Sequence, residues 1–199
     1  MKFVSIIMGS KSDYEVVYEA AKILNEFGAA YEMIVSSAHR SPARTAKYVA
    51  DAEKKGAQVF ICAEGMAAHL AGAVAANTTK PVLGVPLGGS ALSGVDALYS
   101  TVQMPAGIPV ATLAIGKAGA KNAAYLAVQI LALNDEVLSS KLKADRAAKS
   151  GTRKAEKSAP KKSEAKKGTA KAGRKTAASK KGAAKKIGKS PVQKKSGAK

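Results

Sequence analysis

Residues 3–13 read FVSIIMGSKSD, and this stretch decides which fold the sequence predicts. Its first six residues are mostly apolar with little polar alternation, which is typical of a strand buried on both faces. A turn with Gly9, Ser10 and Ser12 follows, and Asp13 can cap the helical pattern behind it. Strand, turn and helix in this order form the repeating unit of parallel α/β sheets.

The same unit recurs along the first three quarters of the chain. We expect short buried strands over residues 3–8, 31–35, 58–63, 82–85 and 110–115. Helical patterns alternate with them over residues 13–27, 42–55, 66–76, 96–102, 119–133 and 134–149. This alternation predicts an α/β protein, a three-layer αβα sandwich with a parallel sheet, whose ligand site lies beyond the carboxyl ends of the strands.

Charge divides the chain into two parts. Residues 1–149 hold 15 Lys and Arg against 12 Asp and Glu, a net charge of +3. Residues 150–199 hold 18 against 2, a net charge of +16, and contain no aromatic residue. Such a segment cannot bury enough apolar surface to offset its chain entropy. We therefore expect a folded domain over residues 1–149 and a disordered Lys/Ala-rich tail over residues 150–199.

Cysteine usage and hydropathy exclude several classes of protein. Cys62 is the only cysteine, so no internal disulfide can form, and its apolar surroundings favour a buried core residue over a nucleophile. This usage fits the reducing cytoplasm. The apolar run at the start is too short for a signal peptide, and no stretch approaches the ~20 apolar residues of a membrane span. We expect a cytoplasmic protein with no membrane partner.

The turn after the first predicted strand offers groups that suit an anion. Glycine allows close approach of the backbone, and the start of a helix presents free N–H groups and a positive dipole end. The hydroxyls of Ser10 and Ser12 add donors, whereas phosphate repels Asp13, which fits a ribose hydroxyl or the helix cap better. A phosphate-binding turn and a plain capped turn both fit these residues.

The turn after the second predicted strand reads SSAHRSP over residues 36–42. His39 lies there among small residues, and imidazole is suited to proton transfer near neutral pH. Arg40 can bind a phosphate or carboxylate with two hydrogen bonds. The alternative is a surface histidine that is hydrogen-bonded to the backbone.

His69 is the second of the two histidines, and it follows Gly65 at the end of the third predicted strand. It either contacts a ligand or packs as a helix residue. Two histidines without a cysteine or carboxylate cluster at ligand spacing argue against a zinc site, so we expect no metal site. Two further loops, at residues 103–109 and 116–123, contain Gly or Pro and fit either a binding role or simple turns.

Five segments together resemble the aminoimidazole ribonucleotide carboxylase family, and specifically its 5-(carboxyamino)imidazole ribonucleotide mutases. The resemblance covers about residues 3–146. It rests on MGSKSD at residues 8–13, SAHR at 37–40, AAHL at 67–70, QMP at 103–105 and GAKNA at 119–123, which fall in the family's order. One such motif alone would be weak, but five in order are highly specific.

The resemblance implies a flavodoxin-like fold, a homo-octamer and a purine-biosynthesis enzyme without a cofactor. It implies that a carboxylate moves from the exocyclic nitrogen of a phosphoribosyl-imidazole substrate to a ring carbon, through decarboxylation and recapture of carbon dioxide. His39 is then the general acid/base. The implied substrate contacts are Ser10, Ser12, Asp13, Ser37, Arg40, Gly65 and His69.

The sequence departs from the family pattern at Glu64 and Met66, where the mutases often have a run richer in glycine. This departure bears on the carboxylate pocket. The sister class, which uses free carbon dioxide, is described by a lysine after the loop histidine, whereas this chain has Arg40 there. The resemblance therefore favours the mutase, with the direct carboxylase as the alternative.

Residues 150–199 lie outside the resemblance and carry repeated Lys-Lys pairs, like the tail of a linker histone. A flexible chain of this charge attracts polyanions, so we expect nucleic-acid binding that does not depend on base sequence. The alternatives are a solvated polycation without a dedicated partner and a protein whose main function is nucleic-acid binding.

Overall fold

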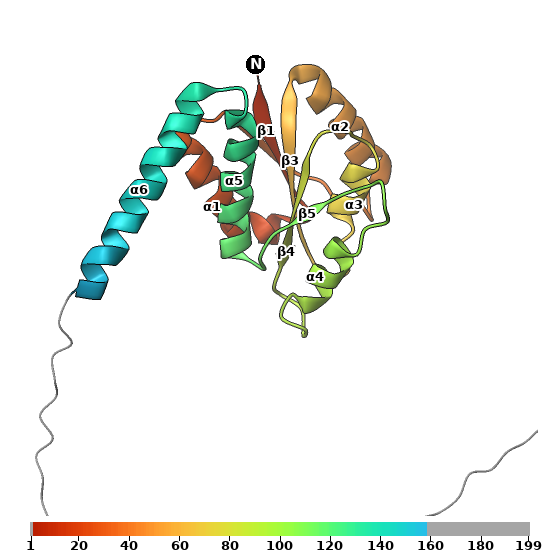
Figure 1. Ribbon diagram of the computed structural model, residues 1–199. Helices are drawn as coiled ribbons and strands as arrows, with labels where there is room; N and C mark the ends of the chain where they lie inside the picture. Colours follow the sequence, from red (N-terminus) through yellow and green to blue (C-terminus); the bar gives the residue numbers. More distant parts are fainter. Residues whose placement is uncertain (1, 159–199) are drawn as a thin grey trace, which may run out of the picture. The chain divides into compact units, whose positions relative to one another are not determined.

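The computed structural model describes residues 2–158, which form a five-stranded parallel sheet covered by helices (Figure 1). The strands are β1 (Phe3–Met8), β2 (Tyr31–Val35), β3 (Ala57–Gly65), β4 (Val82–Leu87) and β5 (Ala111–Thr112). Their spatial order is β2-β1-β3-β4-β5, and every neighbouring pair is parallel. This is the strand order of flavodoxin-like sheets, so the predicted fold class is confirmed.

Helices cover both faces of the sheet and complete three layers (Figure 1). α1 (Tyr14–Phe27) and α5 (Lys117–Ala132) pack side by side on one face, and α6 (Glu136–Ser158) packs on α5. The other face carries α2 (Pro42–Lys55), α3 (Leu70–Ala75) and α4 (Val95–Val102). A 3-10 turn, η1 (Lys11–Asp13), joins β1 to α1.

Two apolar cores fill the space between the layers. β1 is buried along its whole length, and alternate side chains enter opposite cores. Ile6 packs in the core under α1 and α5, whereas Ile7 packs in the core under α2 and α3. Ser5 is the polar exception, and its hydroxyl is hydrogen-bonded to that of Tyr48 at 2.8 Å. This burial on both faces explains why the strand lacks polar alternation.

The first two long helices have the bounds that their sequence predicts, within one residue. Gly28 ends α1 with a φ of 71°, and Gly56 ends α2 with a φ of 111°. Residues with a side chain rarely adopt this left-handed backbone, whereas glycine does so without strain. Pro42 begins α2, where its missing N–H costs no helical hydrogen bond.

Two elements are several residues shorter than the sequence predicts. The helix expected over residues 66–76 begins only at Leu70, because Met66 has a φ of 59°, which no right-handed helix contains. The strand expected over residues 110–115 is reduced to Ala111–Thr112 at the sheet edge. Beyond it the chain still follows β4, since the Leu113 N–H donates to the Gly84 carbonyl at 2.9 Å.

α6 runs to Ser158, nine residues beyond the boundary at Lys149 that composition predicts. Lysine, alanine and arginine favour helix, which explains how a basic segment continues it. The rest of the predicted tail, residues 159–199, lies outside the described residues. None of the described helices combines the length and apolar character needed to cross a lipid bilayer.

Candidate functional site

Loops at the carboxyl ends of β1, β2, β3 and β4 surround a pocket of about 680 Å³. After β1 the chain continues to β2 on one side of the sheet, and after β3 it continues to β4 on the other side. The pocket therefore lies at the switch point of the sheet, where α/β proteins bind ligands. Its lining residues are Gly9, Ser10, Ser12, Asp13, Ser37, His39, Arg40, Glu64, Gly65, Met66, Ala67, Gly88 and Gly89.

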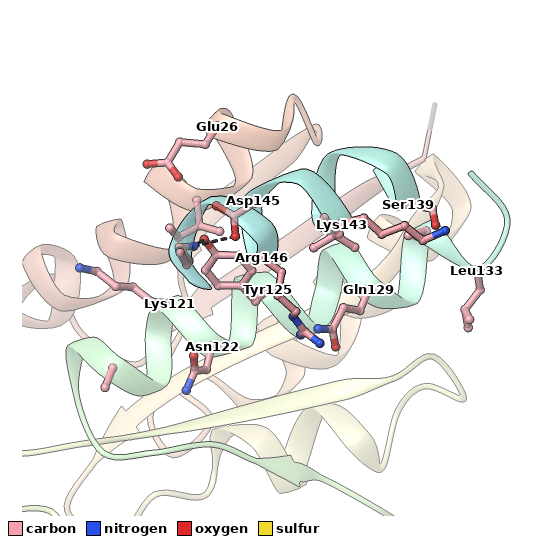
Figure 2. Close-up of a pocket in the computed structure, with 15 residues that line it drawn as sticks. Glu26, Lys121, Asn122, Tyr125, Gln129, Leu133, Ser139, Lys143, Asp145 and Arg146 are labelled. Carbon is pink, nitrogen blue, oxygen red and sulfur yellow. Dashed lines mark hydrogen bonds and ion pairs between the residues drawn. The ribbon is translucent and has the colours of Figure 1, made fainter. Parts of the chain in front are cut away.

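A larger groove of about 910 Å³ lies away from these loops, between α5 and α6 (Figure 2). It contains neither histidine and no strand end, and side chains such as Tyr125, Gln129 and Arg146 line it. Lys121 and Asn122, from the glycine-containing turn that the sequence singles out, belong to this groove. The strand-end pocket is nevertheless the better candidate, because it gathers the groups that can move protons and hold anions.

The loop after β1 is an ordered turn that is closed by its own side chains. The Ser10 N–H donates to Asp13 Oδ2 at 3.0 Å, and the Ser12 N–H donates to Ser10 Oγ at 3.3 Å. The Ser12 hydroxyl also donates to Ser10 Oγ at 2.9 Å. These bonds form a capping box around η1. The turn is therefore capped, but the prediction that Asp13 caps the first helix is wrong: Ser10 is the capping residue of η1, and the Asp13 side chain makes no cap hydrogen bond to α1. The hydroxyls of Ser10 and Ser12 line the pocket.

The loop after β2 is fixed below the pocket by buried hydroxyls. Ser36 is buried, its N–H donates to the Met8 carbonyl at 2.9 Å, and its hydroxyl bonds that of Thr45 at 2.8 Å. The Arg40 N–H donates to Ser37 Oγ at 3.2 Å. These bonds hold the backbone while the side chain of His39 stays 52% exposed at the pocket.

Glu64, at the end of β3, links the third loop to the second. Its Oε2 accepts the N–H groups of His69 and Leu70, both at 2.7 Å, and so caps the first turn of α3. Its Oε1 lies 3.9 Å from Nδ1 of His39. The rings of His39 and His69 lie 5.2 Å apart between centroids. The two histidines, 30 residues apart in sequence, are therefore neighbours.

The charged side chains that line the pocket are one guanidinium, that of Arg40, and two carboxylates, those of Asp13 and Glu64. Among residues 2–158, Arg40 forms no ion pair, so its guanidinium is available to a ligand. Burial raises the pKa of Asp13 above its ordinary value, and the hydrogen bonds from Ser10 and Ser12 oppose that shift. A phosphate placed near Arg40 would find a cation that no protein carboxylate neutralises.

Cys62 lies in β3 and is 2% exposed. Burial strongly raises the pKa of its thiol, so it stays protonated and unreactive. The prediction of a buried core cysteine is confirmed. Among residues 2–158, no three His, Cys, Asp or Glu side chains gather as a metal site would require.

The structure brings seven of the eight predicted site residues to this pocket, and His69 lies just behind His39, against a separate cavity. Sequence reasoning did not assign the Gly88 and Gly89 backbone to the site, although a Gly-Gly pair directly after a buried strand was an available signal. It connected Glu64 with the carboxylate pocket only as a departure from the family pattern. No local signal showed that Glu64 faces His39, because the two are 25 residues apart in sequence.

The arrangement combines an imidazole, a guanidinium, hydroxyl donors and a floor of small residues. Ala67, Gly65 and Gly88 line the same pocket as His39 and take up little volume. An imidazole in such a pocket can give and take one proton. The pocket is therefore suited to proton transfer on a bound ligand that carries an anionic group.

Comparisons with known proteins agree with this geometry. The family profile described as AIR carboxylase matches residues 3–152. The N5-carboxyaminoimidazole ribonucleotide mutase of Vibrio cholerae is 55% identical over 144 residues, which span 72% of this chain and 89% of the relative. The enzyme of the same name from Escherichia coli K12 is 53% identical over 147 residues, 74% of this chain and 87% of the relative.

A solved structure shares the architecture. The crystal structure of Treponema denticola PurE superposes with a TM-score of 0.72 at 26% sequence identity, and the match covers 79% of this chain and 98% of that one. Profile, relatives and structure all agree over the region that carries the pocket. The chain belongs to the AIR carboxylase family.

Proposed function

We propose that this protein is an isomerase of purine biosynthesis, an N5-carboxyaminoimidazole ribonucleotide mutase. It interconverts 5-carboxyamino-1-(5-phosphoribosyl)imidazole and 5-amino-1-(5-phosphoribosyl)imidazole-4-carboxylate. The observation that carries this proposal is that His39 and Arg40 line one pocket at the switch point of the sheet, in a chain more than 50% identical to mutases. Among residues 2–158, Arg40 has no ion pair. The single buried cysteine fits a cytoplasmic site of action.

His39 is the group that moves the proton. In the first half of the reaction the bond from the exocyclic nitrogen to the carboxylate carbon breaks, and its electron pair stays on nitrogen, which takes a proton from His39. In the second half the ring carbon attacks the released carbon dioxide, and His39 removes the proton left on that carbon. The histidine ends as it began, so no redox partner is needed.

The remaining residues hold the substrate. Arg40 binds the phosphate through charge-assisted hydrogen bonds, with Ser10, Ser12 and Ser37 as further donors. Asp13 accepts hydrogen bonds from the ribose hydroxyls, because its anionic carboxylate would repel the phosphate. Gly65 and Ala67 enclose the carbon dioxide, with His69 behind them. A small dry cavity matters here, because escape of carbon dioxide ends the reaction.

A substrate assay tests the mutase against the direct carboxylase. We expect purified full-length protein to interconvert the two carboxylated ribonucleotides at a rate independent of added bicarbonate. The control is the uncarboxylated nucleotide, which should react slowly even with bicarbonate present. Fast, bicarbonate-dependent carboxylation of that control, without interconversion, would establish the alternative.

We propose that the active form is a homo-octamer. Support comes from an apolar stripe on and before α4, where Leu92, Val95, Tyr99 and Val102 are 61%, 42%, 63% and 48% exposed. Their spacing puts them along one helix face, and such a stripe normally marks an interface. Light scattering after size exclusion should give eight chains. Tyr99→Glu should reduce this number, whereas Tyr99→Phe should not, and a monomeric parent would refute the proposal.

We propose that the basic segment binds nucleic acid without sequence preference. A charge of +16 over residues 150–199 supports this, because lysines release counterions from phosphates. The truncation should follow Ser158, since α6 runs to that residue. The truncated chain should lose DNA binding and keep turnover within about twofold. Salt-independent DNA binding, or binding that survives the truncation, contradicts the proposal.

A further inference from the structure

Among residues 2–158, Glu64 is the one carboxylate within ion-pair distance of His39, and its two oxygens have different neighbours. Oε2 accepts two backbone N–H groups at 2.7 Å, those of His69 and Leu70. Oε1 has no hydrogen bond among those of residues 2–158 and lies 3.9 Å from His39 Nδ1. Oε2 thus anchors the side chain, whereas Oε1 faces the imidazole of His39.

The position of this carboxylate is tightly constrained. Its side chain is only 12% exposed, although it lines the pocket. Gly9, directly after β1, packs against it, and a Cβ on Gly9 would lie 2.8 Å from Oε1 and 3.0 Å from the Glu64 Cγ. Only glycine at residue 9 leaves the carboxylate where it is. The loops after β1, β2 and β3 therefore fix Glu64 jointly.

Glu64 is poorly suited to bind the substrate itself. The proposed substrate carries a phosphate and a carboxylate, and a fixed anion repels both. Its contacts point instead to a role through a neighbouring side chain. His39 is that neighbour, because its Nδ1 lies within ion-pair distance of Oε1.

We propose that Glu64 is the positioning residue for His39. Its carboxylate favours a proton on Nδ1 and fixes the ring, so that Nε2 is left to exchange the proton with the substrate. Carboxylates that face one imidazole nitrogen set the tautomer in this way in catalytic and metal sites. This inference rests on the proposed function, in which His39 moves the proton.

Glu64→Gln separates this role from the capping of α3. The amide oxygen can still accept the N–H groups of His69 and Leu70, but the charge beside Nδ1 is lost. We expect kcat to fall by about 10- to 100-fold with KM within about threefold of the parent. The ring that gives the first proton is the imidazolium, with both nitrogens protonated. At alkaline pH, where the free ring is neutral, the ¹⁵N chemical shifts of His39 should show mainly the Nδ1–H tautomer in the parent and a mixture in the variant. An unchanged kcat with an unchanged tautomer overturns the inference and leaves Glu64 as a cap only.

Gly9→Ala provides a second variant with the charge retained. Its Cβ displaces the Glu64 carboxylate, so we expect the same loss of Nδ1–H preference and a lower kcat, and a parent-like tautomer in this variant also counts against the inference. The tautomer readout needs no turnover. If His39→Asn keeps parent activity, the proposed function fails, and a shifted tautomer in Glu64→Gln still shows that Glu64 orients the ring.

Discussion

The strand-end pocket and the groove between α5 and α6 differ in size and in chemistry. The groove is larger, at about 910 Å³ against 680 Å³. Two of its cations are already paired, since Lys121 lies 3.1 Å from Glu19 and Lys149 lies 2.7 Å from Asp145. The pocket contains His39 and Arg40, and Arg40 has no ion pair among residues 2–158. Available charge and a proton donor, not volume, mark the site.

The largest expected effect tests whether the chemistry resides in the pocket. His39→Asn removes the group that exchanges the proton and should lower turnover about 10³-fold, or ~4 kcal/mol in the activation free energy. The measurement is the interconversion of the two carboxylated ribonucleotides. Gln129→Ala in the groove is the matched control and should stay within about twofold of the parent. Activity of His39→Asn within a few-fold of the parent rules out the proton-shuttle role.

The next effect tests how much the close packing of α5 contributes to the free energy of unfolding. A Cβ on Gly119 would lie 1.6 Å from the Ala114 carbonyl oxygen. Gly119→Ala should therefore lower the free energy of unfolding by about 3 kcal/mol, as overpacking does. The control is Gly151→Ala in α6, where nothing lies within 4 Å and helix propensity improves. Denaturant unfolding followed by circular dichroism separates the two, and equal midpoints would contradict the packing seen at α5.

A smaller effect compares one arginine from each cavity. Arg40→Met removes a charge-assisted phosphate contact and should raise KM about 10- to 30-fold, or ~2 kcal/mol, with a smaller change in kcat. Arg146→Met in the groove should change KM less than twofold. Steady-state kinetics on both variants makes the comparison. Parallel losses in the two variants would mean that the groove also takes part in binding.

The smallest effect concerns stability and pH. The pKa of Asp13 is raised by burial, so the folded state binds its proton more tightly than the unfolded state does. The stabilisation from this proton is complete below the ordinary pKa of about 3.9, and it is lost as the pH rises through the pKa of Asp13 in the folded state. Asp13→Asn should therefore gain stability relative to the parent between pH 3 and pH 7. Melting temperatures at both values test this, and a relative loss at pH 7 would contradict the sign.

The sequence predicted the local elements well, because their signals are local. Unbroken apolar runs marked the buried strands, and Gly28 and Gly56 marked helix ends through their left-handed backbone. The pocket loops were predictable too, since parallel strands bring their carboxyl ends to one edge. Prediction was weaker where the backbone departs from local preference. Met66 with positive φ delays α3, and an edge position shortens β5.

By itself, the sequence determined the parallel α/β fold, the turns that hold Ser10, Asp13, His39 and Arg40, and the buried place of Cys62, because apolar periodicity and turn chemistry act over a few residues. Only the tertiary structure decided that Glu64 anchors α3 and faces His39, and that His69 stands behind that ring. These contacts depend on β1 lying between β2 and β3, which brings three separate loops to one point. Local sequence preferences act over a few residues, so they do not specify which distant segments come together.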